Sequence, residues 1–294
     1  MNNTHRSSLK KYQEKPSVLV GAAIQSFRSQ GKKTIFVEGV NDKSFLQPWI
    51  NKGFRFDGFV GKEVVEGIAR YFKNDRISQK YIESSFFLAD IDYDLTTEIG
   101  TVSGVQYFFI SNNNEHIYND LDIFIFNSKA LKKLLSNLRL DLPHDEIDYL
   151  KDKIETASRI IGKYRAADYK MTGGNEEKTI LNGLNIIDFF DAISLAVDDE
   201  KIKASIQNWS TSLDIDELVE AAENINSKHT AKWSLSRGHD VSLMLTEHLR
   251  QKYQKNFVSQ QFVEERLRIG CELSELLQTH TGQGLLKFGA IPSD

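Results

Sequence analysis

Thr34-Ile-Phe-Val-Glu-Gly-Val-Asn-Asp-Lys-Ser-Phe-Leu46 is the stretch that decides the fold of this chain. Its first apolar residues are β-branched or aromatic, which is typical of a buried strand. Gly39 permits a sharp turn, and the Asn-Asp pair that follows can cap a helix. The stretch therefore predicts a strand, a turn and a helix, with the carboxylate of Glu38 at the carboxyl end of the strand. Open α/β sheets bind their ligands at this edge.

A second apolar stretch, Phe86-Phe-Leu-Ala-Asp-Ile-Asp-Tyr-Asp94, predicts another strand that runs into carboxylates. Alternation along an extended backbone puts Asp90, Asp92 and Asp94 on one side. Carboxylates gathered at one edge repel each other unless a cation lies among them, and hard oxygen ligands suit Mg²⁺ or Mn²⁺. We therefore predict a metal site built on Glu38, Asp90 and Asp92, with Asp42 and Asp94 as further candidate ligands. The alternatives are a helix cap for Asp42 and solvated loop positions for Asp92 and Asp94.

These two stretches carry a resemblance to a known fold. A strand ending in Glu38-Gly39, an Asp soon after that Gly, and a later strand ending in Asp-x-Asp resemble the TOPRIM domain. This domain occurs in topoisomerases, bacterial primases, RecR-type repair proteins and the OLD nucleases. The order of predicted strands and helices within residues 33–126 also matches. The stretches Tyr118–Leu131 and Arg237-Gly-His-Asp-Val241 look like those of the AriB nuclease subunits of PARIS anti-phage systems.

The resemblance implies a function as well as a fold. In TOPRIM enzymes the Glu is a general acid/base or metal ligand and the Asp-x-Asp pair binds metal, which points to Glu38, Asp90 and Asp92. The PARIS-like stretches imply a toxic nuclease that an ABC-type ATPase partner holds silent and that cuts host tRNA when released. Two alternatives stay open, namely a DNA nuclease of the OLD type and a TOPRIM scaffold that binds nucleic acid or a partner without cutting.

The rest of the chain gives the domain boundaries. Residues 1–32 predict a polar tail and one helix, and residues 33–126 predict the TOPRIM-like α/β domain with its parallel sheet. From residue 127 the apolar spacing becomes helical, so 127–294 predicts a mainly α-helical part. Its helices are expected near 128–138, 145–164, 186–196, 199–206, 215–226, 241–252 and 262–278.

Three further residues are candidates for the catalytic site. Lys62 opens a helix near the carboxyl edge, where it either faces a substrate phosphate or is an ordinary surface lysine. Asp120 and Asp122 lie in a polar span between two apolar runs. This span is either a plain loop or a third acidic wall of the site.

Two basic-aromatic patches are candidates for binding nucleic acid. Lysine and arginine neutralise phosphates while an aromatic ring stacks on an unpaired base. His239 lies in a Gly-containing turn, where a structural role is the alternative. Amphipathic helices display such pairs by default, so ordinary surface positions are also possible. The predicted contacts are Lys163 and Arg165 in one patch, and Lys232, Trp233, Arg237 and His239 in the other.

Composition limits the other possibilities. The chain has 294 residues, a net charge of −4 and one cysteine, which excludes a disulfide framework and a cysteine zinc site. It has no apolar run of membrane-spanning length and no apolar leader, so we expect no membrane contact and a cytoplasmic location. The stretch Gly173–Thr179 lacks the Gly before its Lys that a P-loop requires, so an ATPase must be another chain. We expect a complex with that ATPase at rest and a homodimer when the chain is free.

Overall fold

The computed structural model describes residues 14–112, 115–175, 178–209 and 214–292. Residues 1–13, which make up most of the predicted tail, and residues 176–177 of the P-loop-like stretch lie outside these ranges. The chain forms two compact units. Unit 1 comprises Met1–Asp90, Thr101–Phe108 and Leu273–Asp294, and unit 2 comprises Ile91–Gly100 and Phe109–Glu272.

Unit 1 is built on a four-stranded sheet in which every pair of neighbouring strands is parallel. The strand order is β2-β1-β3-β4, so β1 and β3 are central. This arrangement confirms the predicted α/β class with a parallel sheet. The strands are β1 (Lys33–Val37), β2 (Phe54–Gly58), β3 (Ser85–Asp90) and β4 (Gln106–Phe108).

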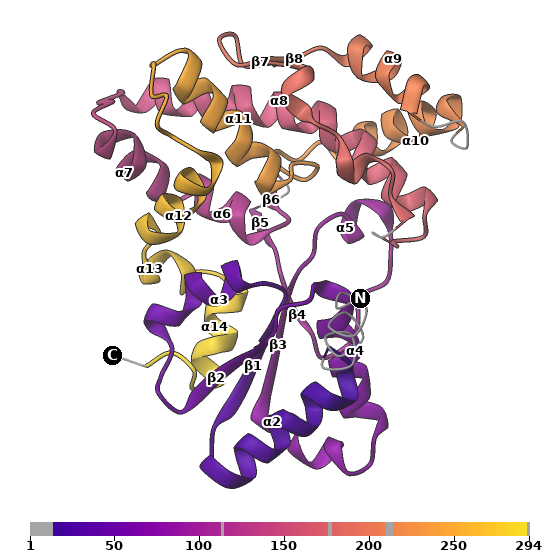
Figure 1. The fold of residues 1–294 in the computed structure, drawn as a ribbon, viewed down its shortest axis with the longest axis vertical. Coiled ribbons are helices and arrows are strands. Elements are labelled where there is room, and N and C mark those ends of the chain that lie inside the picture. Colours follow the sequence, from indigo (N-terminus) through magenta and orange to yellow (C-terminus); the bar gives the residue numbers. More distant parts are fainter. Residues whose placement is uncertain (1–13, 113–114, 176–177, 210–213, 293–294) are drawn as a thin grey trace, which may run out of the picture. The chain divides into compact units, whose positions relative to one another are not determined.

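Helices cover both faces of this sheet (Figure 1). On one face, Phe87 of β3 stacks on Phe36 of β1 and meets Phe72 of α4 edge-on. On the other face, the neighbouring Phe86 contacts Phe288, which follows α14. Crossovers from β1 to β2 and from β2 to β3 run in opposite directions, so right-handed connections put their helices on opposite faces. The helices of unit 1 are α2 (Pro16–Gln30), α3 (Val40–Leu46), α4 (Lys62–Asn74), α13 (Leu273–Leu276) and α14 (His280–Lys287), with 3₁₀ turns at Gln47–Trp49 and Ser78–Ser84.

Unit 2 is mainly helical and is organised around the long helix α8 (His144–Met171). The second half of α8 is buried on almost every side, because α5, α10 and α11 pack against it. The other helices are α5 (Asp94–Thr97), α6 (Leu121–Asn127), α7 (Ala130–Asn137), α9 (Asp199–Trp209), α10 (Ile215–Lys228), α11 (Gly238–Gln251) and α12 (Gln260–Gly270). Two short hairpins pair β5 (Ile110–Asn112) with β6 (His116–Tyr118), and β7 (Phe190–Asp191) with β8 (Ala196–Val197), while 3₁₀ turns lie at Leu181–Gly183 and Ile186–Asp188. No helix within the described ranges is both long and apolar enough to span a membrane.

The structure corrects the predicted alternation of the three aspartates. Strand β3 ends at Asp90, and Asp92 adopts the left-handed backbone conformation with φ of +49°. Asp94 is then the first residue of helix α5. The backbone between them is therefore not extended, and the three carboxylates do not share one side of a strand.

Other predicted elements also differ from the structure. The helix expected near 186–196 is a 3₁₀ turn followed by the β7–β8 hairpin. The helix expected over 262–278 ends at Gly270 and resumes at Leu273. The predicted boundary at residue 126 differs from the observed units as well, because residues 109–126 belong to the helical unit and 273–294 to the sheet unit.

Candidate functional site

Glu38 and Asp90 lie at neighbouring strand ends, at the switch point of the sheet. β2 lies on one side of β1 and β3 on the other, so the direction of the connections reverses between β1 and β3, and these two strands flank the switch point. Parallel sheets bind ligands beyond the carboxyl ends of such strands. Glu38 directly follows β1 and Asp90 is the last residue of β3. The backbone N–H of Asp90 donates a hydrogen bond of 2.6 Å to Oε1 of Glu38.

The loop after β2 holds the backbone of this site in place. The N–H of Phe59 donates to the carbonyl of Val37 at 3.0 Å, and the N–H of Gly61 donates to the carbonyl of Glu38 at 2.9 Å. Gly58 makes this approach possible, since a Cβ there would lie 2.6 Å from the Val37 carbonyl oxygen and its φ is +102°. Neighbouring segments therefore hold Glu38 in place through hydrogen bonds to its side chain and to its carbonyl.

Asp42 and Lys62 lie in the same unit and have identifiable structural contacts. Oδ2 of Asp42 accepts the N–H of Gly39 at 2.8 Å, which caps α3 as the alternative interpretation predicts. Lys62 is the first residue of α4, and its Nζ lies 5.6 Å from the ring centre of Tyr107. The Tyr107 hydroxyl donates to Oε1 of Glu66 at 2.5 Å, and burial followed by this hydrogen bond raises the pKa of Tyr107.

The pair Glu38 and Asp90 fits the ligand chemistry of Mg²⁺. This ion takes hard oxygen ligands and is usually held by one or two carboxylates together with water and substrate phosphates. Among the described residues, no three His, Cys, Asp or Glu side chains are grouped so that they could hold a metal. A Mg²⁺ ion on this pair would complete its shell from water and substrate.

A second group of carboxylates lies in unit 2. The N–H of Asp92 donates to the carbonyl of Asn119 at 2.8 Å. Asp120 accepts the N–H of Ile123 at 2.6 Å and the N–H of Gly238 at 2.7 Å, so one carboxylate caps α6 and binds the first residue of α11. Burial and the charge of Asp122 raise the pKa of Asp120 to about 8, although the two N–H donors act to lower it. Asp120 is therefore a buried link between two helices.

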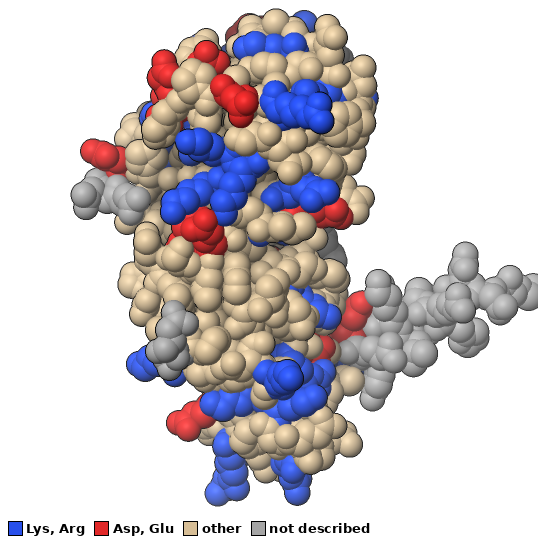
Figure 2. All heavy atoms as spheres, turned by 90° about the vertical axis from the view of Figure 1, so that its left-hand side faces the viewer, with Lys and Arg blue, Asp and Glu red and all other residues tan. Residues whose placement is uncertain are grey.

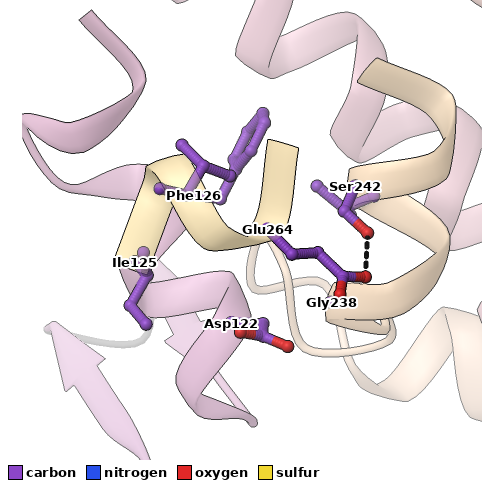
Figure 3. Close-up of a pocket in the computed structure, with 8 residues that line it drawn as sticks. Asp122, Ile125, Phe126, Gly238, Ser242 and Glu264 are labelled. Atoms are coloured by element: carbon purple, nitrogen blue, oxygen red, sulfur yellow. Dashed lines mark hydrogen bonds between the residues drawn. The ribbon is translucent and has the colours of Figure 1, made fainter. Parts of the chain in front are cut away.

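A small pocket lies beside this link (Figure 3). It has about 10 Å³ of room for the centre of a water molecule, enough for about one bound water. Glu264 of α12 points into it and accepts the hydroxyl of Ser242 at 2.9 Å. Arg268 lies 3.4 Å from both Asp122 and Glu264, so one guanidinium balances two carboxylates. The pocket is lined by Asp122, Ile125, Phe126, Gly238, Val241, Ser242, Glu264 and Leu267.

Asp94 is held inside unit 2. Its side chain is buried, and the hydroxyl of Tyr169 on α8 donates to its Oδ1 at 2.8 Å. The role of Asp94 as a further metal ligand stays a prediction. The position of Asp94 joins α5 to α8.

Three of the predicted nucleic-acid contacts are buried, which corrects that part of the prediction. Lys163 lies 2.7 Å from Glu223, and Arg165 forms a buried ion pair of 2.9 Å with Asp240. Trp233 is 2% exposed. A side chain enclosed in this way cannot reach a phosphate or a base, so Lys163, Arg165 and Trp233 serve the packing of unit 2.

The other three predicted contacts remain accessible to different degrees. Lys232 is exposed and pairs with Asp152 at 2.6 Å, and the exposed ring of His239 lies 3.2 Å from Glu264. Arg237 is half-buried, and its guanidinium forms no ion pair within the described part of the chain. Figure 2 shows a face on which Lys and Arg cover more surface than Asp and Glu, although the net charge is −4.

Sequence reasoning missed Phe59 as a residue of the site, and it missed the capping role of Asp120. Phe59 lies in the loop that holds Glu38, and the glycines at 58 and 61 on either side of it were the available signal. Asp120 is the N-cap of α6, and the signal was an Asp directly before the apolar run Leu121–Phe126.

The fold is that of an α/β protein with a parallel sheet, and the switch-point carboxylates form a candidate site at the carboxyl edge of this sheet. Comparison with protein-family models gives no match to this chain, and comparison with curated proteins gives none.

Proposed function

We propose that the chain is a Mg²⁺-dependent phosphodiester hydrolase of the TOPRIM type, with Glu38 and Asp90 as its catalytic carboxylates. The observation that supports this most directly is the 2.6 Å hydrogen bond from the Asp90 N–H to Glu38 across neighbouring strand ends. It brings two acidic residues together at the edge where parallel sheets bind ligands. The resemblance of the sequence motifs to TOPRIM enzymes supports the same class of reaction.

The metal and the protein would have separate tasks. A bound Mg²⁺ would supply positive charge for the phosphate and a more acidic water. Glu38 would be held in a fixed direction by the Asp90 N–H, and the loop bonds to Val37 and Glu38 would keep this edge rigid. Rigid placement of reacting groups lowers the entropic part of the barrier.

The substrate is proposed to be tRNA, and the biological role that of a toxic effector in anti-phage defence. An ABC-type ATPase would restrain the chain at rest, and the free chain would act as a homodimer. Co-expression with such an ATPase should suppress toxicity, and light scattering of the isolated protein should give about twice the chain mass of 33.6 kDa. A toxic monomer that never co-purifies with an ATPase would contradict this part of the proposal.

Cleavage assays on purified variants test the hydrolase proposal. Glu38→Gln and Asp90→Asn keep the size of each side chain but remove its charge, so each should lower the cleavage rate at least about 100-fold. Glu63→Gln is the matched control, because Glu63 is an exposed carboxylate in the same unit. Asp92→Asn belongs in the same series, since the sequence predicts it as a third metal ligand. Circular dichroism checks that each variant is folded.

The substrates in this assay separate the alternatives. Labelled tRNA, single-stranded RNA and plasmid DNA are each incubated with Mg²⁺, Mn²⁺ or EDTA. Metal-dependent cleavage of tRNA alone supports the proposal, and cleavage of DNA alone would indicate the OLD-type nuclease. Wild-type rates in Glu38→Gln and Asp90→Asn would rule out the proposed mechanism. Binding without any cleavage would indicate a scaffold.

A further inference from the structure

Phe59 and Lys43 form a contact between two chain segments that leave the carboxyl edge of the sheet. Lys43 lies on α3, which follows β1, and Phe59 lies in the loop that follows β2. The Nζ of Lys43 is 5.7 Å from the centre of the Phe59 ring. Val40 and Val60, from the same two segments, are 63% and 38% exposed. An aromatic ring, a cation and accessible apolar groups thus lie together in unit 1.

The backbone of Phe59 is held in an unfavourable conformation. Its φ is +65°, in the left-handed region that bulky residues rarely adopt. The hydrogen bonds from Phe59 to Val37 and from Gly61 to Glu38 keep it there. Strain of this kind persists where the surrounding structure fixes it, and it is concentrated at functional sites. The same bonds tie the ring to the backbone of Glu38.

Lys43 lies beside an aromatic ring. Within the described ranges its ammonium group forms no ion pair, and it lies over the Phe59 ring. A lysine with this environment keeps its charge available for an anion such as a phosphate. The ring beside it is only half-buried, so part of it is accessible for stacking with a base.

We infer that Phe59 and Lys43 form a seat for one unpaired nucleotide of the substrate, with the base on the ring and its phosphate at Lys43. This inference rests on the proposed function, because it takes the substrate to be a nucleic acid. It selects single strands and loops over duplex, since bases within a duplex are already stacked and do not offer a free face. Phe59 and Lys43 are positioning residues here, and the carboxylates remain the catalytic groups.

Binding measurements in EDTA test the seat without any metal-dependent cleavage. The probe is a single strand of about ten nucleotides, which is within the usual site size, with one fluorescent 2-aminopurine base. RNA and DNA versions distinguish the two sources of an unpaired nucleotide, and a blunt duplex of the same sequence is the third probe. Anisotropy gives the affinity, and quenching of 2-aminopurine reports stacking.

The variants are chosen so that folding does not obscure the result. Phe59→Asn removes the ring, and asparagine tolerates the left-handed backbone, so the fold should keep or gain thermal stability. We expect this variant to bind the single strand about 5- to 150-fold more weakly and to lose the quenching. Phe59→Tyr keeps a ring and should retain both. Tyr71→Asn is the control, because Tyr71 is an exposed aromatic residue elsewhere in unit 1.

Lys43→Gln gives a second, independent readout. The slope of log affinity against log salt concentration should become shallower by about 0.7, the value for one lost phosphate contact with a single strand. Lys52→Gln, at an exposed loop position of the same unit, should leave the slope unchanged.

The results distinguish failure of the seat from failure of the hydrolase proposal. Equal binding by Phe59→Asn and Tyr71→Asn, an unchanged salt slope in Lys43→Gln, or tighter binding of the duplex would overturn the inference. If the wild type cleaves nucleic acid but Phe59→Asn binds normally, the seat fails and the hydrolase proposal stands. If the seat binds as expected but no metal supports cleavage, the hydrolase proposal fails instead.

Discussion

Asp120 shows how one side chain can determine the arrangement of two helices. Its carboxylate accepts the N–H of Ile123 in α6 and the N–H of Gly238 in α11. Gly238 leaves room for this contact, because a Cβ there would lie 2.8 Å from Oδ1 of Asp120 and 2.4 Å from Cβ of Asp122. The sequence Arg237-Gly-His-Asp240 is therefore explained, in part, by the need for a glycine against α6.

The pKa of Asp120 leads to a prediction about stability and pH. Burial and the nearby charges of Asp122 and Asp92 raise the folded pKa from 3.8 to about 8. Between these two values the folded state holds a proton that the unfolded state has released. The contribution of Asp120 to the free energy of unfolding should therefore fall as pH rises from about 4 to about 8, by at most about 1.4 kcal/mol per pH unit. Above about pH 8 it should level off.

Thermal unfolding of Asp120→Asn at several pH values checks this prediction. The variant cannot release the proton, so its unfolding temperature should fall less with rising pH than that of the wild type. Asp214→Asn, which replaces an exposed capping carboxylate of α10 in the same unit, is the matched control. If the difference in unfolding temperature between the wild type and Asp120→Asn stays constant from about pH 5 to about pH 9, Asp120 does not titrate in this way.

At the scale of elements, the sheet of unit 1 is the part that the sequence predicts best. β1 and β3 are short apolar runs with clear ends, and helical spacing marks α2 before β1 and α4 before β3. Local pattern and tertiary structure agree at these elements. The same local signals place Glu38 and Asp90 at strand ends, and the parallel pairing then brings them together.

The elements that differ from the prediction depend on contacts distant in sequence. Asp92 turns away from the strand direction, and its N–H is bound by the carbonyl of Asn119. Residues 186–196 have helical spacing, but they form a 3₁₀ turn and then a hairpin whose two strands have two residues each. The hydroxyl of Ser194 donates a hydrogen bond to Asp191 within the turn of this hairpin. A pattern with a period of a few residues carries no information about such partners.

The basic residues of α8 show a related limit. Lys163 and Arg165 look like a surface patch because charged residues usually lie on the exposed face of a helix. α8 has no such face along its second half, and both side chains pair with carboxylates of other helices. Gly162 reflects the same crowding, since a Cβ there would lie 1.7 Å from the carbonyl oxygen of Leu235. Burial of this extent depends on the packing of neighbours and not on the helix alone.

At the scale of the whole molecule, the units do not follow the order of the chain. Unit 1 takes its sheet from the first part of the sequence and its last helix from the end. Phe288 lies 5.4 Å, between ring centres, from both Phe54 and Phe86, and Lys33 Nζ lies 4.7 Å from the same ring. Asn51 bonds to the carbonyls of Gly289 and Ala290. The C-terminal segment thus covers one face of the sheet, which a division at residue 126 does not reveal.

Removal of the C-terminal segment should therefore destabilise the sheet and not the helical unit. A chain that ends at Glu272 loses α14 together with the buried Leu285, Ala290 and Ile291, and exposes apolar surface on β3 and β4. Hydrogen exchange followed by mass spectrometry should show faster exchange in β1 and β3, with α8 and α11 protected as in the full chain. Phe288→Ala is the milder version and should lower the free energy of unfolding of unit 1 by about 2–3 kcal/mol, less than for a fully buried ring. Lys287→Ala, an exposed neighbour on α14, is its control. If truncation instead speeds exchange in α8 and α11 while β1 and β3 stay protected, residues 273–294 belong to the helical part, as the sequence alone predicts.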